Sequence, residues 1–331
     1  MKILITGSNG FVGSRLMWFL EEKGHEVFGI DISAHCLRGS HPKTILGDIR
    51  KIEDFATFRK QDITMIIHCA ASKHDFGVSK DEYYSNNEHG TEVVMKFAED
   101  EKIKKIIYFS TVSVYGHEAV PCDENGPLKP DNDYGASKLA GEKVFEKYVA
   151  KDSSLEVLFL RPSIIYGPYN FANMYNLIVI QNRKFWATIG NGSHIKSMIS
   201  LENLVDMVYW CFDRFQPGIQ IYNTLDKPYI TVRELMKIIA SHDGFSFPTI
   251  QVPLGFVLVV GKLFDVIANV LKKDLPINSD RMQKFATSTE YYAEKIRKDG
   301  YVQHHSIEEE LAQTIKWYNE NKHRRKELDV H

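Results

Sequence analysis

The sequence contains few cysteines and no arrangement that would pair them. Its four cysteines show no C-x-x-C spacing, and its 13 histidines include no H-E-x-x-H pair. These absences exclude a disulfide framework and the common zinc-binding motifs. We therefore expect no metal site, and reduced, mostly buried thiols as in a cytoplasmic protein.

The chain also lacks a large excess of charge of either sign. With 41 Lys+Arg and 43 Asp+Glu, the formal net charge is −2, which gives no electrostatic basis for binding nucleic acid. The N-terminal "MKILIT" begins directly with a strand pattern, so no signal peptide is expected. At 331 residues, 44% of them hydrophobic, the chain can form a large core and two subdomains.

No hydrophobic run is long enough to cross a bilayer without a charge. The most apolar stretch, "VPLGFVLVVGKLFDVIANVL" at 252–271, is interrupted by Lys262 and Asp265. The uncharged part is too short to span a membrane, so no stable insertion is expected. A buried or dimer-facing helix is the favoured interpretation, and a helix lying on the membrane surface is the alternative.

Short apolar strand patterns alternate with amphipathic, helix-length segments through the first two thirds of the chain. The predicted strands are 2–6, 25–31, 63–71, 104–110 and 155–161, and the predicted helices include 11–23, 83–100 and 135–150. Strands separated by helices indicate a parallel sheet covered on both faces. Right-handed crossovers then give a doubly wound, Rossmann-type α/β fold with ligands at the carboxyl ends of the strands.

This alternation ends after Gly167, and "IQIYNT" at 219–224 is a late return to the sheet. We therefore predict a discontinuous organisation. Residues 1–165 and 200–226 would form the dinucleotide-binding domain, residues 166–199 and 227–320 a smaller substrate lobe, and residues 321–331 a charged tail.

A glycine-rich turn follows the first predicted strand. In "LITGSNGFVGSRL", Gly7, Gly10 and Gly13 lie between that strand and the next helix. Glycines at these places permit a tight turn and let a pyrophosphate approach the helix N-terminus. Because the triplet stands between a strand and a helix, it is a strong indication of a dinucleotide site.

Two acidic residues further along the chain are candidates for the adenosine end of that site. Asp31 ends the second predicted strand, 18 residues beyond Gly13; a carboxylate there accepts ribose hydroxyls and repels a 2′-phosphate, which favours NAD over NADP. Arg38 is near enough in sequence to weaken this preference. Asp48, in "GDIR", either caps the next helix or contacts the adenine.

Several motifs occur in order along the chain: "TGSNGFVG", "HCAA" (68–71), "NNEHGT" (86–91), "STVSVYG" (110–116) and "YGASK" (134–138). With them the sequence resembles the extended short-chain dehydrogenases/reductases, and among these the NAD-dependent sugar-nucleotide epimerase/dehydratase family. The resemblance covers essentially the whole chain. It implies an NAD cofactor and a homodimer, in which helices 83–100 and 135–150 pair into a four-helix bundle.

The resemblance assigns cofactor contacts residue by residue. Asp48 would lie at the adenine, Cys69 to Ala71 along the diphosphate and ribose, and Asn87 in the structural network behind the active site. The implied cofactor-binding set is Gly7, Asn9, Gly10, Phe11, Val12, Gly13, Asp31, Asp48, Ile49, Cys69, Ala70, Ala71, Asn87, Ser110, Tyr134, Lys138 and Pro162.

The resemblance makes Tyr134 the catalytic acid/base, Lys138 its partner and Thr111 the third member of the catalytic set. The chemistry agrees, because residues at i and i+4 share a helical face. Tyrosine has an ordinary pKa of about 10, and a neighbouring ammonium favours the phenolate. The Thr111 hydroxyl can hydrogen-bond the substrate oxygen as it passes between alcohol and ketone.

The substrate contacts follow less directly from the motifs. Many family members carry asparagine where this chain has Ile164, and Asn173 is the candidate replacement on the sugar-nucleotide diphosphate. Lys196 stands at a position that the family fills with arginine, and lysine offers a point charge in place of a bidentate fork. Arg281 is a further candidate for the phosphates. The predicted substrate-binding set is Thr111, Tyr134, Asn173, Lys196 and Arg281.

The resemblance leaves several activities open, of which a nucleotide-hexose 4-epimerase acting through a transient 4-keto sugar is the leading one. UDP-sugars are the favoured substrates. The alternatives are a sugar-nucleotide 4-ketoreductase, a 3β-hydroxysteroid dehydrogenase-like enzyme and a non-catalytic NAD-binding sensor. A 4,6-dehydratase is not expected, because Val112 and Ser113 replace the acidic pair that those enzymes carry directly after the threonine.

Overall fold

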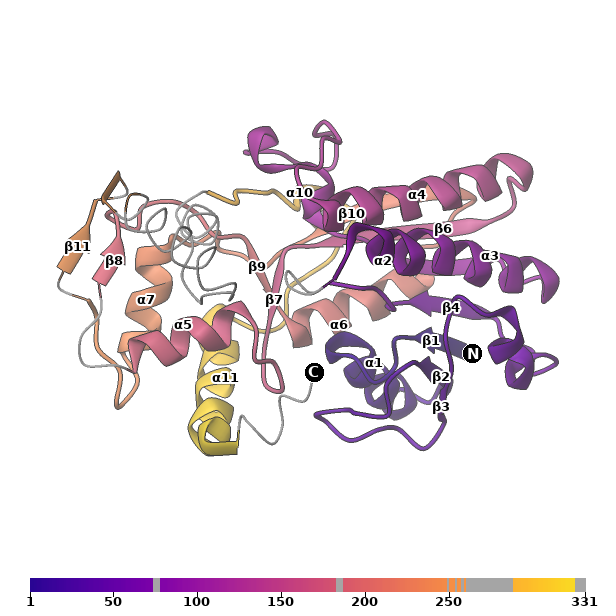
Figure 1. Cartoon of the computed structure of the whole chain (residues 1–331), viewed down its shortest axis with the longest axis horizontal. Coiled ribbons are helices and arrows are strands. Elements are labelled where there is room, and N and C mark those ends of the chain that lie inside the picture. Colours follow the sequence, from indigo (N-terminus) through magenta and orange to yellow (C-terminus); the bar gives the residue numbers. More distant parts are fainter. Residues whose placement is uncertain are drawn as a thin grey trace.

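The computed structural model describes residues 1–73, 78–182, 187–248, 250–253, 255–256, 259 and 288–324. A seven-stranded sheet, in the order β10-β6-β5-β4-β1-β2-β3, forms one half of the molecule (Figure 1). Its strands are β1 (Lys2–Thr6), β2 (Glu26–Asp31), β3 (Thr44–Leu46), β4 (Met65–His68), β5 (Lys105–Phe109), β6 (Glu156–Pro162) and β10 (Gly218–Thr224). All neighbouring pairs are parallel. The predicted doubly wound sheet, with the late return at 219–224, is confirmed.

Each central strand contributes side chains to both faces of the sheet, as a doubly covered sheet requires. In β1, Ile3 and Ile5 belong to one buried cluster, whereas Leu4 belongs to the other. The first cluster includes side chains of α1 (Phe11–Glu22) and α6 (Leu201–Trp210). The second includes side chains of α3 (Gly90–Asp100) and α4 (Asp133–Lys151).

Three elements of the structure differ most from the prediction. Strand β3 was not predicted, because its three residues are too few to establish an alternating pattern. Strand β4 ends at His68, so that residues 69–71 leave the sheet three residues earlier than predicted. The predicted helix 83–100 begins earlier, as α2 (Lys80–Tyr84), and passes through a π-helical turn at Ser85–His89 before it continues as α3.

The other half of the molecule has a core of its own. Helices α5 (Asn173–Gln181), α7 (Val232–Ala240) and α11 (Ile307–Asn321) enclose a third hydrophobic cluster (Figure 1). Two short parallel pairs accompany them: β7 (Ile164–Tyr166) with β9 (Met198–Ser200), and β8 (Ala187–Ile189) with β11 (Ile250–Val252). Helix α10 (Glu294–Lys298) packs beside β10. The exact domain boundaries given above stay a prediction.

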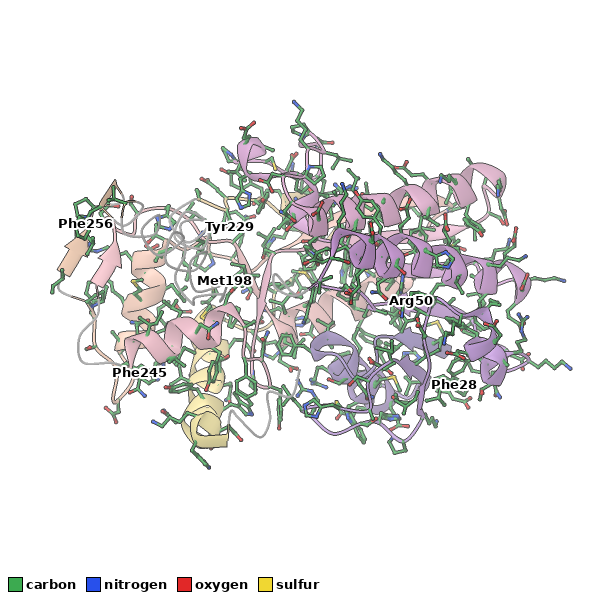
Figure 2. The ribbon with its side chains drawn as sticks, in the orientation of Figure 1. Phe28, Arg50, Met198, Tyr229, Phe245 and Phe256 are labelled. Atoms are coloured by element: carbon green, nitrogen blue, oxygen red, sulfur yellow. The ribbon has the colours of Figure 1, made fainter. Side chains whose placement is uncertain are left out.

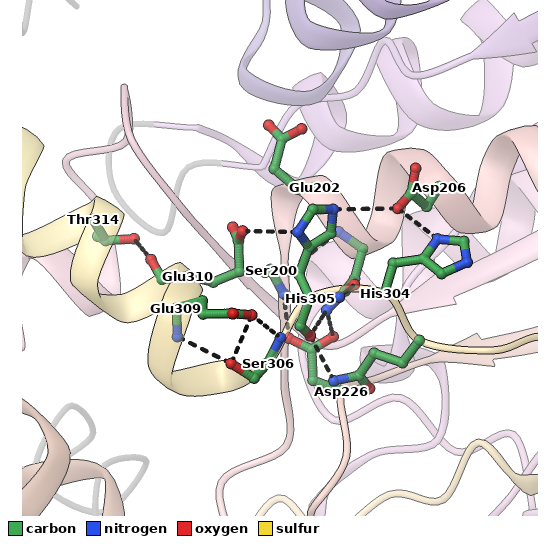
Figure 3. Close-up of polar contacts among 12 residues, drawn as sticks. Ser200, Glu202, Asp206, Asp226, His304, His305, Ser306, Glu309, Glu310 and Thr314 are labelled. Carbon is green, nitrogen blue, oxygen red and sulfur yellow. Dashed lines mark hydrogen bonds and ion pairs between the residues drawn. The ribbon is translucent and has the colours of Figure 1, made fainter.

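A buried polar cluster joins α11 to the start of α6 (Figure 3). The backbone N–H of His305 donates to Asn203 Oδ1 (3.1 Å), and Asn203 Nδ2 donates both to the His305 carbonyl (2.9 Å) and to Asp226 Oδ1 (2.8 Å). Asp226 Oδ2 accepts from the backbone N–H of Ser200 (2.7 Å). Because Ser200 is the N-cap of α6, these bonds connect the two halves of the molecule through side chains that water does not reach.

In the part of the chain that the structure describes, no helix combines the length and the apolarity needed to cross a membrane. Most of the apolar stretch 252–271 lies outside the described residues. No group of three or more His, Cys, Asp and Glu side chains suited to hold a metal ion occurs among the described residues.

Candidate functional site

A cavity of about 990 Å³ opens at the carboxyl ends of β1, β2, β4, β5 and β6. The strand order reverses between β1 and β4, and ligands of doubly wound sheets bind at such a switch point. Many residues that the sequence assigned to a site line this one cavity: Gly7, Asn9, Gly10, Phe11, Val12, Gly13, Asp31, Asp48, Ile49, Cys69, Ala70, Ala71, Ser110, Thr111, Tyr134, Pro162 and Asn173. Their individual roles stay predictions.

The glycine turn is packed so tightly that side chains could not replace its hydrogens. Gly7 has φ +70°, and a Cβ atom there would lie 2.7 Å from the backbone nitrogen of Ala70. A Cβ atom on Gly13 would lie 2.0 Å from the Gly7 carbonyl oxygen. Gly10 is the N-cap of α1 and offers no side chain to cap it. The first N–H groups of α1 therefore remain available at the cavity for an anion such as a diphosphate.

Asp31 is held by backbone donors at the next strand end. Its Oδ2 accepts from the Asn9 N–H (2.9 Å) and its Oδ1 from the Ser33 N–H (2.8 Å). Burial raises the pKa of Asp31, while these backbone hydrogen bonds lower it. Each carboxylate oxygen has a further lone-pair direction, so the group can accept ribose hydroxyls without losing its protein partners.

Asp48 forms an ion pair with an arginine. Of its two predicted roles, the one as the cap of the next helix is wrong. Lys51 is the N-cap of the 3₁₀ helix that follows at Ile52–Phe58. The Asp48 carboxylate accepts from Arg50 Nη2 (2.6 Å) and Nε (2.8 Å). Arg50 holds the pKa of Asp48 below its usual range. Both side chains line the cavity, and Arg50 lies near the centre of the sheet half in Figure 2.

Thr111 and Tyr134 come together because two chain segments approach unusually closely. Thr111 Oγ1 accepts from the Ser113 N–H (3.2 Å), which fixes the turn after β5. Asn132 caps α4 by accepting from the Gly135 N–H (2.8 Å), and Tyr134 is the second residue of that helix. A Cβ atom on Gly135 would lie 2.5 Å from the Ser113 carbonyl oxygen. Glycine at 135 thus lets the start of α4 rest on the turn that carries Thr111.

Lys138 lies one helical turn after Tyr134 and is 1% exposed. It does not line the cavity; its Nζ lies 4.1 Å from the centre of the Tyr108 ring. Burial lowers the pKa of Lys138 to about 7. A buried lysine with a strongly lowered pKa is typical of functional sites. The cation lies behind the cavity wall and not on its surface.

Asn87 also lies behind this wall. It sits in the π-helical turn, where its Oδ1 accepts from the Ser72 N–H (2.9 Å) and its Nδ2 donates to Ser137 Oγ (2.9 Å). Ser137 precedes Lys138, so Asn87 connects the strand-end segment at 72 to the helix of the Tyr-Lys pair.

Of the other two predicted cations, Lys196 is the one that the structure describes. Lys196 does not line the cavity; its backbone N–H donates to Ile230 O, and burial lowers the pKa of Lys196 to about 8. Arg281 lies outside the described residues.

Several lining residues escaped the sequence analysis. His117 and Asp131 line the cavity as a hydrogen-bonded pair, and Asp131 Oδ2 also accepts from the His117 N–H (2.8 Å). Asp131 stands three residues before Tyr134, and this closeness in sequence could have indicated that Asp131 belongs to the site. Tyr169 also escaped the sequence analysis. Tyr169 and the already considered Arg38 line the cavity from two different loops, and only the tertiary structure shows that they touch.

The residues present fit a dinucleotide. The glycine turn lacks room for side chains, an uncapped helix begins there, and a carboxylate follows at the end of β2. Tyr134 and Thr111 lie in the same cavity as this turn, so a phenol and a hydroxyl group would share that cavity with a bound dinucleotide.

Comparison with known proteins agrees with this arrangement. The model of the NAD dependent epimerase/dehydratase family matches residues 3–223. The chain is 28% identical, over 96% of its length and 95% of the relative, to the N-acetyl-alpha-D-glucosaminyl-diphospho-ditrans,octacis-undecaprenol 4-epimerase of Escherichia coli O157:H7. It is 31% identical to the UDP-glucose 4-epimerase of Vibrio cholerae, over 80% of this chain and 82% of that protein.

Solved structures share the fold over nearly the full length. The UDP-glucose 4-epimerase of Bifidobacterium longum, in complex with NAD⁺ and UDP, has a TM-score of 0.75 at 22% identity, covering 97% of this chain and 99% of that one. The dTDP-glucose 4,6-dehydratase of Bacillus anthracis, in complex with NAD, has a TM-score of 0.75 at 21% identity, covering 99% of both chains. The chain is an enzyme of the NAD-dependent epimerase/dehydratase family, within the extended short-chain dehydrogenases/reductases.

Proposed function

We propose that this enzyme is a nucleotide-hexose 4-epimerase that acts through a transient 4-keto sugar. The observation that carries the proposal is the position of Thr111 and Tyr134 in one cavity with the glycine turn, without an acidic pair after Thr111. Val112 and Ser113 occupy those two positions, and neither can transfer a proton at neutral pH. A 4,6-dehydratase reaction is therefore not proposed.

In this proposal the protein binds, orients and exchanges a proton at the C4 oxygen. Tyr134 takes the hydroxyl proton as hydride leaves C4, and returns it when hydride comes back to the other face of the sugar. Thr111 holds the same oxygen through its hydroxyl. Lys138, buried one turn below Tyr134, favours the phenolate whenever it carries its proton.

NAD would supply the hydride acceptor at this site. The N–H groups at the start of α1 would hold its diphosphate and Asp31 its adenosine ribose. The cavity wall at Cys69, Ala70 and Ala71 lies against Gly7, so this segment would lie along the diphosphate. Asn173, at the first turn of α5, is proposed to contact the diphosphate of the substrate.

A second candidate substrate is a hexose diphosphate carried on a lipid. The Escherichia coli relative is named for such a substrate. Ile250, Phe256 and Val259 are 59%, 64% and 68% exposed, and Phe256 lies at the far end of the helical half (Figure 2). We propose that these exposed apolar side chains contact the lipid part of such a substrate.

Conversion assays separate these candidates. Purified enzyme would be given UDP-glucose, UDP-N-acetylglucosamine and polyprenyl-diphosphate-linked N-acetylglucosamine in detergent, and the C4 epimers would be followed by NMR. Separate assays would supply a 4-keto sugar nucleotide with a reduced cofactor, and a 3β-hydroxysteroid with NAD. Formation of a C4 epimer without accumulation of NADH supports the epimerase. Net consumption of a reduced cofactor moves the assignment to the 4-ketoreductase, and oxidation of a 3β-hydroxysteroid to the steroid enzyme. Absence of turnover with retained NAD favours the sensor.

We also propose a cytoplasmic homodimer. Helices α3 and α4 pack together on one face of the sheet (Figure 1), and a second copy would add its own pair to them. The four cysteines are unpaired, as expected in a reducing compartment. Light scattering at micromolar concentration tests the dimer, and a monomer mass would contradict it.

A further inference from the structure

Two loops on different sides of the cofactor cavity touch through the side chains of Arg38 and Tyr169. Arg38 lies between β2 and β3, and Tyr169 lies between β7 and α5; both line the cavity. The guanidinium carbon of Arg38 lies 4.4 Å from the centre of the Tyr169 ring. A guanidinium at this distance over an aromatic face makes a cation–π contact. The pair therefore bridges the dinucleotide half and the helical half across the cavity.

The backbone of Tyr169 is held in an unusual conformation. Its φ is +68°, a left-handed value that residues with a side chain rarely adopt. The neighbouring Asn170 fixes the turn, because its Nδ2 donates to the Ile165 carbonyl (3.3 Å) and its Oδ1 accepts from the Ala172 N–H (2.8 Å). The Tyr169 ring also lies 5.5 Å from the ring of Trp317 in α11. Strained residues persist where the surrounding structure determines them, often at ligand clamps.

Arg38 has a donor that the described residues leave unused. Its Nε is buried and has no hydrogen-bond partner among them. The neighbouring acidic group is engaged, because Glu202 binds Arg15 through Nη2 (2.8 Å) and Nε (2.8 Å). Burial lowers the pKa of Arg38, and the charge of Arg15 lowers it further. Among the described residues no carboxylate forms an ion pair with Arg38, and a buried cation of this kind is stabilised by an anionic ligand.

We propose that Arg38 and Tyr169 form a clasp that retains the dinucleotide: the positive charge of the Arg38 guanidinium attracts a phosphate of NAD, and Tyr169 packs over the guanidinium. The clasp slows release of the cofactor between turnovers. In this proposal Arg38 contacts a part of the cofactor that NAD and NADP share, and it does not read a 2′-phosphate. The proposal depends on the family's cofactor and not on which sugar is epimerised.

The test compares the rate at which NAD leaves the enzyme. Enzyme loaded with NAD would be mixed with an excess trap of labelled NAD, and exchange would be followed in wild type, Arg38→Gln, Tyr169→Ala and the double variant. Loss of the contact should accelerate release about tenfold. Since the two side chains act as one unit, the double variant should be no faster than either single one.

Two control variants separate the clasp from general damage. Tyr169→Phe keeps the ring and should release NAD as slowly as wild type. Lys43→Gln removes a charge from the same β2–β3 segment, where Lys43 pairs only loosely with Glu21 (3.8 Å), and should also leave release unchanged. If Tyr169→Ala does not fold, Tyr169→Leu takes its place, because it fills the space without an aromatic face.

Two results would overturn the proposal. One is unchanged NAD release in both Arg38→Gln and the Tyr169 variant. The other is a selective loss of NADP affinity in Arg38→Gln with NAD affinity unchanged, which would make Arg38 a reader of the 2′-phosphate. Failure of the epimerase assignment gives a different pattern, because NAD release would still be accelerated while no sugar substrate is converted.

Discussion

Arg161 of β6 and Glu142 of α4 form an ion pair that water does not reach. Arg161 Nη2 lies 2.6 Å from Glu142 Oε2, and Arg161 Nε donates to Glu142 Oε1 (2.9 Å). The two side chains are 2% and 1% exposed. Ser110 Oγ also donates to Glu142 Oε1 (2.5 Å). Because Glu142 follows Lys138 by four residues, this pair fixes the face of α4 that carries the proposed catalytic couple.

Glu142→Gln should destabilise the fold strongly. The substitution leaves the Arg161 guanidinium buried beside a neutral amide, and removal of one partner of a buried ion pair typically costs about 3–5 kcal/mol. Urea unfolding would measure the loss. Glu101→Gln is the matched control, because Glu101 pairs with Arg59 nearer the surface (3.0 Å), where such pairs contribute about 0–1 kcal/mol. Similar losses of unfolding free energy in both variants would show that the buried pair does not stabilise the fold more than a surface pair does.

Tyr134→Phe should keep the cofactor and lose the reaction. The ring and its packing 6.2 Å from the Tyr83 ring remain, whereas the proton-transferring hydroxyl is absent. General acid/base catalysis typically contributes about 10²–10⁴-fold, so kcat should fall by that order while NAD content stays at the wild-type level. Tyr83→Phe provides the matched control. Full activity in Tyr134→Phe would exclude the proposed mechanism.

Asp31→Ala should narrow the preference for NAD over NADP. The carboxylate repels a 2′-phosphate and accepts hydrogen bonds from ribose hydroxyls in the proposed complex. Its removal should therefore weaken the binding of NAD and strengthen the binding of NADP. Because Ala also leaves the N–H groups of Asn9 and Ser33 without their acceptor, Asp31→Asn is the second variant and retains one carbonyl oxygen. Calorimetric titration with both oxidised cofactors measures the change, and tighter NADP binding by the wild type would contradict the argument.

Sequence patterns predicted the local parts of this site but not those made by tertiary contacts. Gly7, Gly10 and Gly13 stand between a strand and a helix, and this order can be recognised from the sequence alone. The burial of Lys138 on α4, by contrast, depends on the Tyr108 ring from strand β5. The Glu142–Arg161 pair likewise joins a helix to a strand, and neither residue belongs to a motif. A charged residue with no motif is ordinarily predicted to be exposed.

The same limit explains the differences in the fold. Residues Thr44–Leu46 form a strand because β2 provides backbone partners for them, and three residues carry no periodicity of their own. The π-helical turn at Ser85–His89 could not be predicted from the helical periodicity of the sequence. It nevertheless positions Asn87 for its hydrogen bonds to Ser72 and Ser137. The contact between Arg38 and Tyr169 spans 131 positions of sequence and depends on both halves of the molecule.

The cluster between α6 and α11 should make stability depend on pH (Figure 3). Burial raises the pKa of Glu310 to about 7, and the charge of His305 lowers it in part. Burial likewise raises the pKa of Asp226 to about 6, against hydrogen bonds led by the Ser200 N–H. A carboxyl group whose pKa is higher in the folded state contributes stability below its unfolded pKa, and this contribution is lost as pH rises through the folded value. The unfolding temperature should therefore fall between pH 5 and pH 8.

Glu310→Gln should flatten this decline. The amide cannot ionise, so the cost of burying a carboxylate above pH 7 disappears, and the variant should exceed wild type by a few degrees at pH 8, as expected for about 1 kcal/mol in a chain of this size. At pH 5 the two proteins should unfold at nearly the same temperature. Glu308→Gln, an exposed change on the same helix, should follow the wild-type curve. If the unfolding temperatures of wild type and Glu310→Gln change with pH in parallel, Glu310 titrates as an ordinary surface carboxylate. The reason is that stability depends on pH only where the folded and unfolded states bind different numbers of protons.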